Sequence, residues 1–472
     1  MTCSFMTRRR FLKLTATCVA AAPLAASLQG WPAAGVPAVI RERGDAAKPN
    51  IVLVVVDALR ADHVSANGYA RGVTPNLDGM IAANGVTFRQ TTTASPWTFP
   101  ANAALMTGRL PFRFNATWDN TILPSTEFTL AKALKKAGYT TAGFVSAPYI
   151  RAAPNGFGQG FDIYDDSVAN TNVLGMSGAA GPINHAAQAW LASWSSGSQP
   201  LFLFLYYFDP HTWYNPPPPY DTLYDPSYAG TLTPGVYKNG EDVVGGKIVP
   251  SPRDIEHLRA LYDGEIAYWD AMFGLMLNDL NGRGVLDNAL VMVTADHGDM
   301  FGEHGKWTHG NCLYEDVLRI PLLMRYPGVV PEGSAVDAPV QAMDIMPTIL
   351  DWLGLDTPAN LDGVSLRSLA EGRGAPARDV FSEIERVTDP HHWAYWLAPR
   401  SDLRSIRRGD YKYIHHLRDG VSDELYRLGS ASPYETGNVI DEDPATAQQL
   451  RQSLFERYHL AAHEVVLPVV VR

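Results

Sequence analysis

Short runs of apolar residues alternate along the chain with longer stretches in which apolar residues recur at helical spacing. Residues 50–56 (NIVLVVV) are almost wholly apolar and β-branched, which is typical of a strand buried on both faces of a parallel sheet. Similar strands are predicted at residues 140–145, 201–208, 289–295 and 320–326. Helices are predicted between them, at residues 127–137, 184–193, 253–280 and 342–353. This alternation predicts an α/β fold in which helices sandwich a large, central, mostly parallel sheet.

The pattern changes after about residue 375. Short strands are predicted at residues 380–383, 403–407 and 411–415, and a closing helix at residues 445–458. We therefore expect a main domain over residues 49–375 and a small C-terminal α+β subdomain over residues 376–472.

The N-terminal residues have the features of an export signal. Three arginines, Arg8 to Arg10, precede Phe11-Leu12-Lys13 and a mild apolar run, a pattern that resembles a bacterial twin-arginine signal peptide. The run contains Pro23 and is too short and too polar for a stable membrane span. We expect residues 1–30 to be this signal, residues 31–48 to be a linker, and the protein to be periplasmic or secreted through the twin-arginine export machinery.

Composition and charge narrow the class of protein. The 472 residues are 46% hydrophobic and 18% charged, as in ordinary globular proteins. The formal charge of −11 becomes −15 without the four basic residues of the signal, which argues against nucleic acid as a partner. Cys3 and Cys18 lie in the signal, so Cys312 alone remains and neither a disulfide framework nor a cysteine zinc site can form.

Metal-ligand side chains follow three of the predicted strands. Asp57 comes directly after the first strand, Asp209 and His211 follow residues 201–208, and Asp296 and His297 follow residues 289–295. Because ligands collect beyond the carboxyl ends of strands in open α/β sheets, these groups predict a divalent-cation site. An Asp in such a position can alternatively cap a helix.

A threonine is placed to act as a nucleophile. Thr98 lies two residues before Pro100, at a position that suits the first residue of a helix. A hydroxyl there faces unpaired N–H groups that favour an anion, and a cation beside it would lower its pKa. The alternative is that Thr98 only caps the helix.

Several short motifs, in this order, resemble those of the sulfatase family within the alkaline phosphatase superfamily. They cover nearly the whole chain after the signal: residues 49–62, 103–109, 158–162, 208–211, 294–298, 302–305, 344–348, and 410–413 through 424–426. The resemblance implies an alkaline-phosphatase-like fold, a sulfatase-like catalytic domain and a hydrolase that acts on small-molecule, glycan or lipid esters.

The resemblance also assigns residues to roles. The family's metal ligands fall on Asp57, Asp296 and His297, and its nucleophile, which also contacts the metal, falls on Thr98. His211 and His309 match positions that hold the anionic oxygens or protonate the leaving group, and Lys306 is a further oxyanion contact.

Two residues depart from the family pattern. Thr98 replaces the Cys or Ser that becomes formylglycine, and Asn102 replaces an Arg. Direct attack by Thr98 resembles instead the nucleotide pyrophosphatase/phosphodiesterases and the phosphoethanolamine transferases, and loss of the Arg favours singly charged phosphodiesters or phosphonate esters. The alternatives are a conventional sulfuric ester hydrolase, a phosphoryl-group transferase and a non-catalytic binding protein.

The number of metal ions is predicted from the remaining acids and histidines. The family's usual second Asp is Ala58 here, and the nearest spare carboxylates are Asp62 and Glu303. A second ion would need Asp209 together with His211 and His309. Their spacing differs from that of two-metal phosphodiesterases, which favours one ion, whether Zn, Mn, Ca or Mg.

Overall fold

The computed structural model describes residues 48–171, 178–194, 199–212, 214–232, 242–418, 420–429 and 433–460. Residues 1–47, which hold the expected signal peptide and nearly all of the expected linker, lie outside these ranges. Within them, no helix combines the length and the apolar character needed to cross a membrane.

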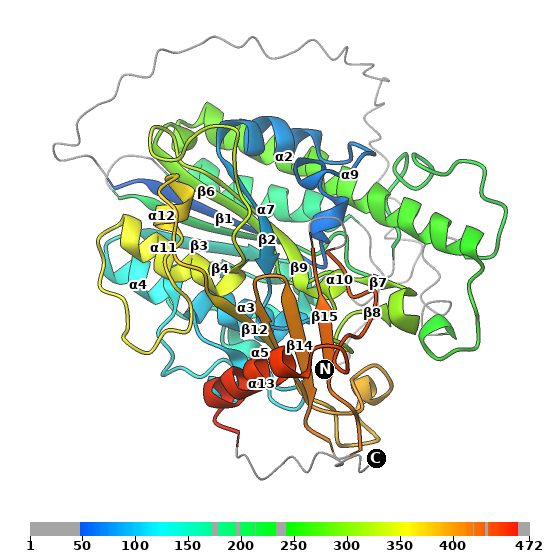
Figure 1. Cartoon of the computed structure of the whole chain (residues 1–472). Coiled ribbons are helices and arrows are strands. Elements are labelled where there is room, and N and C mark those ends of the chain that lie inside the picture. Colours follow the sequence, from blue (N-terminus) through cyan, green and yellow to red (C-terminus); the bar gives the residue numbers. More distant parts are fainter. Residues whose placement is uncertain are drawn as a thin grey trace, which may run out of the picture. The chain divides into compact units, whose positions relative to one another are not determined.

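A nine-stranded mixed sheet forms the centre of the fold (Figure 1). Its strands are β1 (Asn50–Val56), β2 (Val86–Thr92), β3 (Thr140–Val145), β4 (Ile163–Asp165), β5 (Leu201–Tyr207), β6 (Ala289–Ala295), β9 (Arg319–Arg325), β10 (Ser334–Val336) and β11 (Val340–Gln341). The order is β10-β2-β9-β6-β1-β5-β3-β4, and β11 also pairs with β2. β9 runs antiparallel to β2 and β6, whereas the other pairs are parallel. The predicted, mostly parallel sheet is confirmed.

The register around β1 determines where the site forms. β1 lies between β5 and β6, and Val56 is level with both Tyr207 and Ala295. At the other end of the strand, the Asn50 side chain accepts from the backbone N–H of Leu201 and donates to a carbonyl before β6, which ties the three chain segments together. The residues that follow the three strands therefore leave the sheet side by side.

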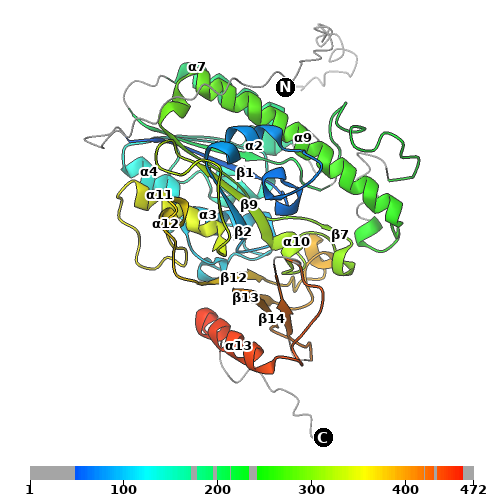
Figure 2. The same cartoon turned by 45° about the horizontal axis from the view of Figure 1, so that its top comes forward.

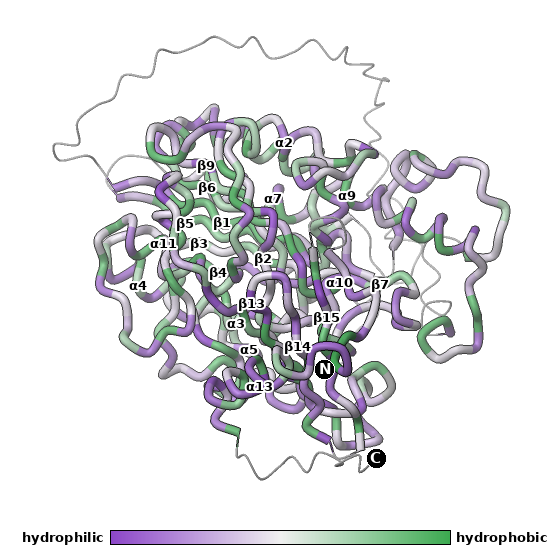
Figure 3. Tube along the Cα trace, viewed as in Figure 1, coloured by the Kyte–Doolittle hydropathy of each residue, from purple (hydrophilic) through white to green (hydrophobic). Residues whose placement is uncertain are grey.

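Helices cover both faces of the sheet (Figures 1 and 2). One layer contains α2 (Pro75–Met80), α7 (Ala180–Ser193) and α9 (Pro252–Gly282), and the other contains α3 (Thr98–Thr107), α4 (Leu130–Lys136) and α11 (Ile345–Trp352). Shorter helices are α5 (Ala152–Asn155), α6 (Ser167–Thr171), α10 (Glu315–Leu318) and α12 (Arg367–Ala370). The hydrophobic residues concentrate on the strands between the layers (Figure 3).

The C-terminal part forms its own antiparallel sheet. Its strands, in spatial order, are β12 (Asp379–Ile384), β13 (Leu403–Arg408), β14 (Tyr411–His416) and β15 (Glu424–Arg427), and α13 (Pro444–Tyr458) packs on β13 and β14. A second hydrophobic cluster joins Ala104 of α3 and Met343 to Phe381 and Ile406 of this sheet. The small C-terminal α+β unit thus matches the prediction, while its boundary at residue 375 stays a prediction.

Candidate active site

Three of the predicted ligands meet where β1 and β6 end. The Nε2 atom of His297 lies 3.5 Å from Oδ1 of Asp57 and 3.6 Å from Oδ2 of Asp296. All three side chains are buried, and their ligand atoms lie within 4.8 Å of one another. The hydroxyl oxygen of Thr98 joins them at 3.4 Å from the same Nε2.

These residues fit a divalent cation. Ligands around a four-coordinate ion at about 2.1 Å lie about 3.4 Å apart, which is the separation of His297 Nε2 from Thr98 and Asp57. Both carboxylate oxygens of Asp57 are buried and have no hydrogen-bond donor among the described residues, a costly arrangement that a cation would relieve. The structure thus supports the predicted ligand set of two carboxylates, an imidazole and a hydroxyl.

Asp296 is held in place by four donors. Its Oδ1 accepts from the backbone N–H groups of Ala58 and His297, and its Oδ2 accepts from Tyr206 at 2.7 Å and Asn102 at 3.1 Å. Ala58 has a φ of 58°, in the left-handed region, and its N–H lies 3.1 Å from Oδ1 of Asp296. Ala58, which stands where the family has a second Asp, therefore contributes to the site through its backbone N–H, which donates to Asp296.

Burial shifts the pKa of two of the ligands, and a cation would counter the shift at Asp57 and reinforce the one at His297. Burial, followed by repulsion from Asp296, raises the pKa of Asp57 well above its ordinary value. Burial lowers the pKa of His297 to about 4, although Asp296 opposes the shift. The His297 Nδ1–H donates to the carbonyl of Gly298 at 2.9 Å, so Nε2 carries the lone pair that faces the site.

Thr98 is the first residue of α3, as predicted. Its neighbour Trp97 is the N-cap, and the helix start has no side-chain capping hydrogen bond. The Thr98 hydroxyl instead faces His297, at the end of the helix where free N–H groups favour an anion. Thr98 is therefore not the N-cap of α3, and its role as nucleophile stays a prediction.

Asn102 occupies the place of the family's Arg, one turn along α3. Its Nδ2 donates to the Thr98 carbonyl at 2.8 Å and to Asp296, so it connects the predicted nucleophile to a predicted ligand. Its Oδ1 is buried without a partner among the described residues. The neutral amide brings no positive charge, which distinguishes this site from one built around a guanidinium.

His309 and His211 form the other wall of the site. The His309 ring lies 4.3 Å from that of His297 and 4.8 Å from that of His211, centroid to centroid. The His211 Nδ1–H donates to the Thr212 carbonyl, and burial together with the nearby His309 lowers the pKa of His211 to about 3. The structure thus places both imidazoles beside His297, while their roles in catalysis stay a prediction.

Asp299 is a site residue that the sequence prediction missed. The His309 Nδ1–H donates to its Oδ1 at 3.0 Å, and its Oδ2 accepts from the hydroxyls of Thr212 and Tyr214. Asp299 is fully buried. Its position directly after the Asp296–Gly298 motif was the signal that could have indicated it.

Asp209, which the sequence offered as a ligand for a second ion, has a different role. Its two oxygens accept three backbone N–H bonds, from Gly178, Ala179 and Ala180 at the start of α7. Burial raises its pKa to about 6. Asp209 therefore takes the alternative role of capping a helix, although the helix is α7 rather than one that follows β5.

The spare carboxylates Asp62 and Glu303 also make contacts other than with a metal ion. Both bind the buried guanidinium of Arg60, which pairs as well with Asp316 and donates to the Asp299 carbonyl. A second group of potential ligands, His304, Asp316 and Glu435, has its carboxylates held by Arg60 and by Lys412. These acids form an ion-pair network behind the site.

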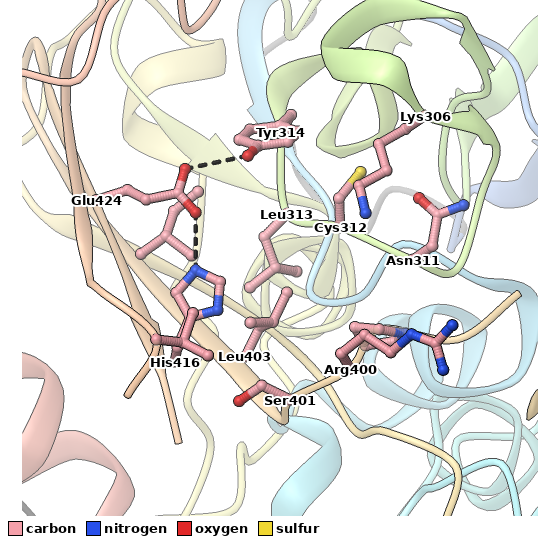
Figure 4. A pocket seen from close by; sticks show the side chains of 13 residues that line it. Lys306, Asn311, Cys312, Leu313, Tyr314, Arg400, Ser401, Leu403, His416 and Glu424 are labelled. Carbon is pink, nitrogen blue, oxygen red and sulfur yellow. Dashed lines mark hydrogen bonds and ion pairs between the residues drawn. The ribbon is translucent and has the colours of Figure 1, made fainter. Parts of the chain in front are cut away.

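Lys306 does not join the cluster. It is exposed, and among the described residues it makes no hydrogen bond or ion pair with Thr98, His211 or His309. Instead it lines a pocket between the loop that carries His309 and the C-terminal sheet (Figure 4). Cys312, on the same wall, is buried.

Comparison with known proteins points to one family and one fold. A profile of the sulfatase family matches residues 49–355, and one for the C-terminal part of N-sulphoglucosamine sulphohydrolase matches residues 302–462. The arylsulfatase of Clostridium perfringens is 26% identical over 453 residues, which cover 82% of this chain and 92% of that protein. The multifunctional alkaline phosphatase superfamily protein PehA of Trinickia caryophylli is 25% identical over 498 residues, which cover 86% of this chain and 93% of that protein. The phosphonate monoester hydrolase of Agrobacterium radiobacter has the same fold, with a TM-score of 0.70 and 23% identity over 89% of this chain and 96% of that one.

The fold and the site define a hydrolase that acts on ester bonds, within the alkaline phosphatase superfamily. The chain belongs to the sulfatase family. Members of this family generally use a divalent metal ion, and the Asp57, Asp296 and His297 group is where the described residues can hold one.

Proposed function

We propose that the chain is a metal-dependent hydrolase that cleaves sulfate or phosphate esters by in-line attack of Thr98, with phosphodiesters or phosphonate esters as the favoured substrates. The observation that carries the proposal is the Thr98 hydroxyl at the start of α3, 3.4 Å from His297 Nε2 and beside the unpaired Asp57 carboxylate. A divalent cation held there would lower the pKa of the Thr98 hydroxyl and offset charge on the ester oxygens.

In the first step Thr98 Oγ1 attacks phosphorus or sulfur. A bond forms between Oγ1 and phosphorus or sulfur, and the bond to the ester oxygen breaks. The phosphoryl, phosphonyl or sulfuryl group stays on Thr98 as a covalent ester. The hydroxyl proton of Thr98 is lost to solvent as the alkoxide forms, and His309, as an imidazolium stabilised by Asp299, donates its Nε2 proton to the departing oxygen on the opposite side. The free N–H groups at the start of α3 bind the equatorial oxygens.

In the second step water hydrolyses the Thr98 ester. The neutral His309 accepts a proton from the water as its oxygen bonds to phosphorus or sulfur, and the bond to Oγ1 breaks. Oγ1 departs as the alkoxide, and His309 is left as the imidazolium that the next first step requires. His211 is kept neutral by its lowered pKa, and its single N–H is bonded to the Thr212 carbonyl, so it adds no charge and lines the site beside His309.

The preference for singly charged esters rests on Asn102. A phosphate monoester carries two negative charges, and an Arg at this position would balance one of them. The neutral Asn102 amide favours substrates with one charge: phosphodiesters, phosphonate esters and sulfate esters. Sulfuric ester hydrolysis is the second candidate, because the arylsulfatase of Clostridium perfringens is similar over most of both chains.

The test is a rate panel on the metal-loaded protein. It compares bis-p-nitrophenyl phosphate, p-nitrophenyl phenylphosphonate, p-nitrophenyl phosphate and p-nitrophenyl sulfate, each with Thr98→Ala, Thr98→Ser and the control Thr107→Ala at the other end of α3. We expect the diester or the phosphonate to react fastest, Thr98→Ala to lose at least about 10³-fold, and Thr107→Ala to stay active. Turnover retained in Thr98→Ala would overturn the nucleophile, and sulfate in the lead would favour the second candidate.

We also propose that residues 1–30 direct export by the twin-arginine route. The support is the Arg8–Arg10 cluster before Phe11-Leu12-Lys13. Expression of the chain and of a variant with Arg8→Lys and Arg9→Lys, followed by fractionation of cytoplasm and periplasm, tests the proposal. The unchanged chain should reach the periplasm and the variant should remain in the cytoplasm; equal distribution of the two would contradict it.

A further inference from the structure

Two tryptophan rings stack against each other beside the candidate nucleophile. Trp97 directly precedes Thr98 and is the N-cap of α3. Its ring lies parallel to that of Trp118, with 4.0 Å between the ring centroids and 6° between the ring planes. Both residues are buried, at 3% and 6% exposed. The stack therefore holds the chain around Trp118 against the start of α3.

The backbone that follows His309 packs on the same two rings. Gly310 has a φ of 74°, and a Cβ built at this residue would lie 2.8 Å from Cζ2 of Trp118 and 3.6 Å from Cβ of Trp97. A glycine is needed for so close a contact. The backbone N–H of Gly310 also donates to the Pro96 carbonyl at 2.9 Å. The chain just after His309 is thus fastened to the chain just before the candidate nucleophile.

The turn that carries His309 is strained. Thr308 has a φ of 57°, in the left-handed region that a β-branched residue rarely adopts. Such strain persists only where the surrounding structure holds the backbone in place. On one side, Thr308 pairs with Met300 in a two-stranded hairpin. On the other side, Gly310 contacts the Trp118 ring, so removal of that ring would let the turn relax away from α3.

The nucleophile side of this contact has support of its own. α3 is buried along its whole length, so its packing fixes Thr98 without help from Trp118. Trp118 belongs to an irregular segment in which Thr117 and Asn120 exchange backbone hydrogen bonds. The part of the site that depends on the Trp118 ring is therefore the turn with His309.

We propose that Trp118 is a positioning residue that holds the His309 turn against the chain before Thr98, and so keeps His309 within reach of the departing ester oxygen. It acts through Gly310, the neighbour of His309. This inference rests on the proposed function, in which His309 gives a proton to the leaving group, and adds a residue outside the sequence motifs. Displacement of a catalytic group by about 1 Å can cost about 10²-fold in rate, which sets the scale of the expected effect.

The first test compares two leaving groups in one class of ester, phenyl phenylphosphonate and p-nitrophenyl phenylphosphonate, on the metal-loaded protein. Phenolate needs a proton as it departs, whereas p-nitrophenolate is stable enough to leave without one. Trp118→Leu should therefore lower kcat by about tenfold to a hundredfold for the phenyl ester and by less than about threefold for the p-nitrophenyl ester. Trp118→Phe keeps a stacking ring and should restore most of the rate with the phenyl ester.

Trp352→Leu is the control for loss of a buried indole. Trp352 is also 6% exposed, and its ring packs on Tyr326 at 5.7 Å between centroids. The substitution should lower the free energy of unfolding and leave the ratio of the two rates unchanged, because neither partner belongs to the candidate site.

Gly310→Ala disturbs the same contact from the other side. Its Cβ would meet the Trp118 ring and push the turn away, so the loss should again be greater for the phenyl ester. Gly305→Ala is the matched control, because Gly305 has a similar φ of 68° in the same loop and open space where a Cβ would lie. It should leave the ratio of the two rates unchanged.

Hydrogen exchange tests the contact without turnover. Exchange of the Gly310 amide, which is bonded to Pro96, should accelerate by at least about tenfold in Trp118→Leu and stay unchanged in Trp352→Leu. Unchanged exchange in Trp118→Leu would overturn the inference, as would an equal change of the rate ratio in Trp352→Leu.

The two measurements separate this inference from the proposed function. Faster exchange in Trp118→Leu with equal losses for the two leaving groups would support the positioning of the turn and contradict proton donation by His309. Turnover retained in Thr98→Ala would contradict the proposed nucleophile, and the exchange of the Gly310 amide would still decide the role of Trp118.

Discussion

The Nδ1 atom of His309 lies 3.0 Å from Oδ1 of Asp299, and the pair is buried beside the predicted nucleophile. Burial alone would raise the pKa of Asp299, but His309 and the Thr212 hydroxyl outweigh it and hold this pKa below its ordinary value. Asp299 therefore stays ionised and fixes the His309 proton on Nδ1, which leaves Nε2 free to accept and donate protons.

Asp299→Asn is expected to reduce kcat by about 10²-fold or more with little loss of fold, because the amide can donate to Nδ1 and favour the wrong tautomer of His309. Nitrogen NMR of the histidines, which distinguishes the tautomers, and steady-state rates check this. Tyr214→Phe is the control, since it removes a different donor to Asp299 and keeps the contact with His309. An unchanged tautomer in Asp299→Asn would contradict the role of Asp299.

Asn102→Ala is expected to weaken metal binding by about tenfold to a hundredfold, because it removes a donor to Asp296 and loosens the start of α3. Titration of the metal-free protein with Zn²⁺ or Mn²⁺ measures the affinity. Asn184→Ala removes a buried Asn that bonds to Tyr207 and Met272 away from the ligands, and should leave the affinity unchanged. Equal effects of the two substitutions would show that Asn102 acts only through stability.

Asp209→Ala is expected to lower the free energy of unfolding by about 1–2 kcal/mol, because three N–H groups at the start of α7 lose their acceptor. The metal content should remain one ion per chain. Asp209→Asn, which keeps an acceptor oxygen, should recover part of the stability. Urea unfolding and metal analysis measure both effects, and loss of an ion in Asp209→Ala would restore the two-metal alternative.

Glu383 should make the C-terminal sheet sensitive to pH. Burial, partly opposed by Arg404, raises its pKa to about 7, above the value of 4.5 for an unhindered glutamate. The folded state therefore keeps a proton that the unfolded state has already lost, so stability is full below about pH 4.5 and falls as the pH rises to about 7.

Glu383→Gln should remove this part of the pH dependence. Between pH 5 and 7 the unfolding free energy of the unchanged protein should fall by about 2 kcal/mol more than that of the variant. Urea unfolding at the two pH values measures the difference. The exposed Glu332→Gln serves as the control, and parallel pH curves for Glu383→Gln and the unchanged protein would contradict the assignment.

The β-branched runs made the sheet predictable. The strands at residues 50–56, 140–145 and 289–295 were predicted with the ends that the structure has. The direction of a strand could not be predicted, because an apolar run carries no information on direction. β9 runs antiparallel to its neighbours. β2 was not predicted because Arg89 and Gln90 interrupt its apolar pattern, at a register shift between Phe88 and Thr91.

Site residues could be predicted where they directly follow a strand. They could not be predicted where their contacts are with residues far away in the sequence. Asp57, Asp296 and His297 meet because their strands are neighbours in the sheet. Asp209 follows a strand in the same way, yet it caps α7, whose start lies thirty residues earlier in the sequence. Tyr206, inside an apolar run, could not be recognised as a donor to Asp296.

Within the part of the chain that the structure describes, neither oxygen of the buried Asp57 carboxylate is bonded to a donor, and this has a consequence for which ion the protein acquires. A pair of unsatisfied oxygens beside one imidazole discriminates poorly among divalent cations. Their affinities for such a site follow the Irving–Williams order, and the supply of each cation differs between cell compartments. The ion that the site holds would therefore record which divalent cations were present while the chain folded.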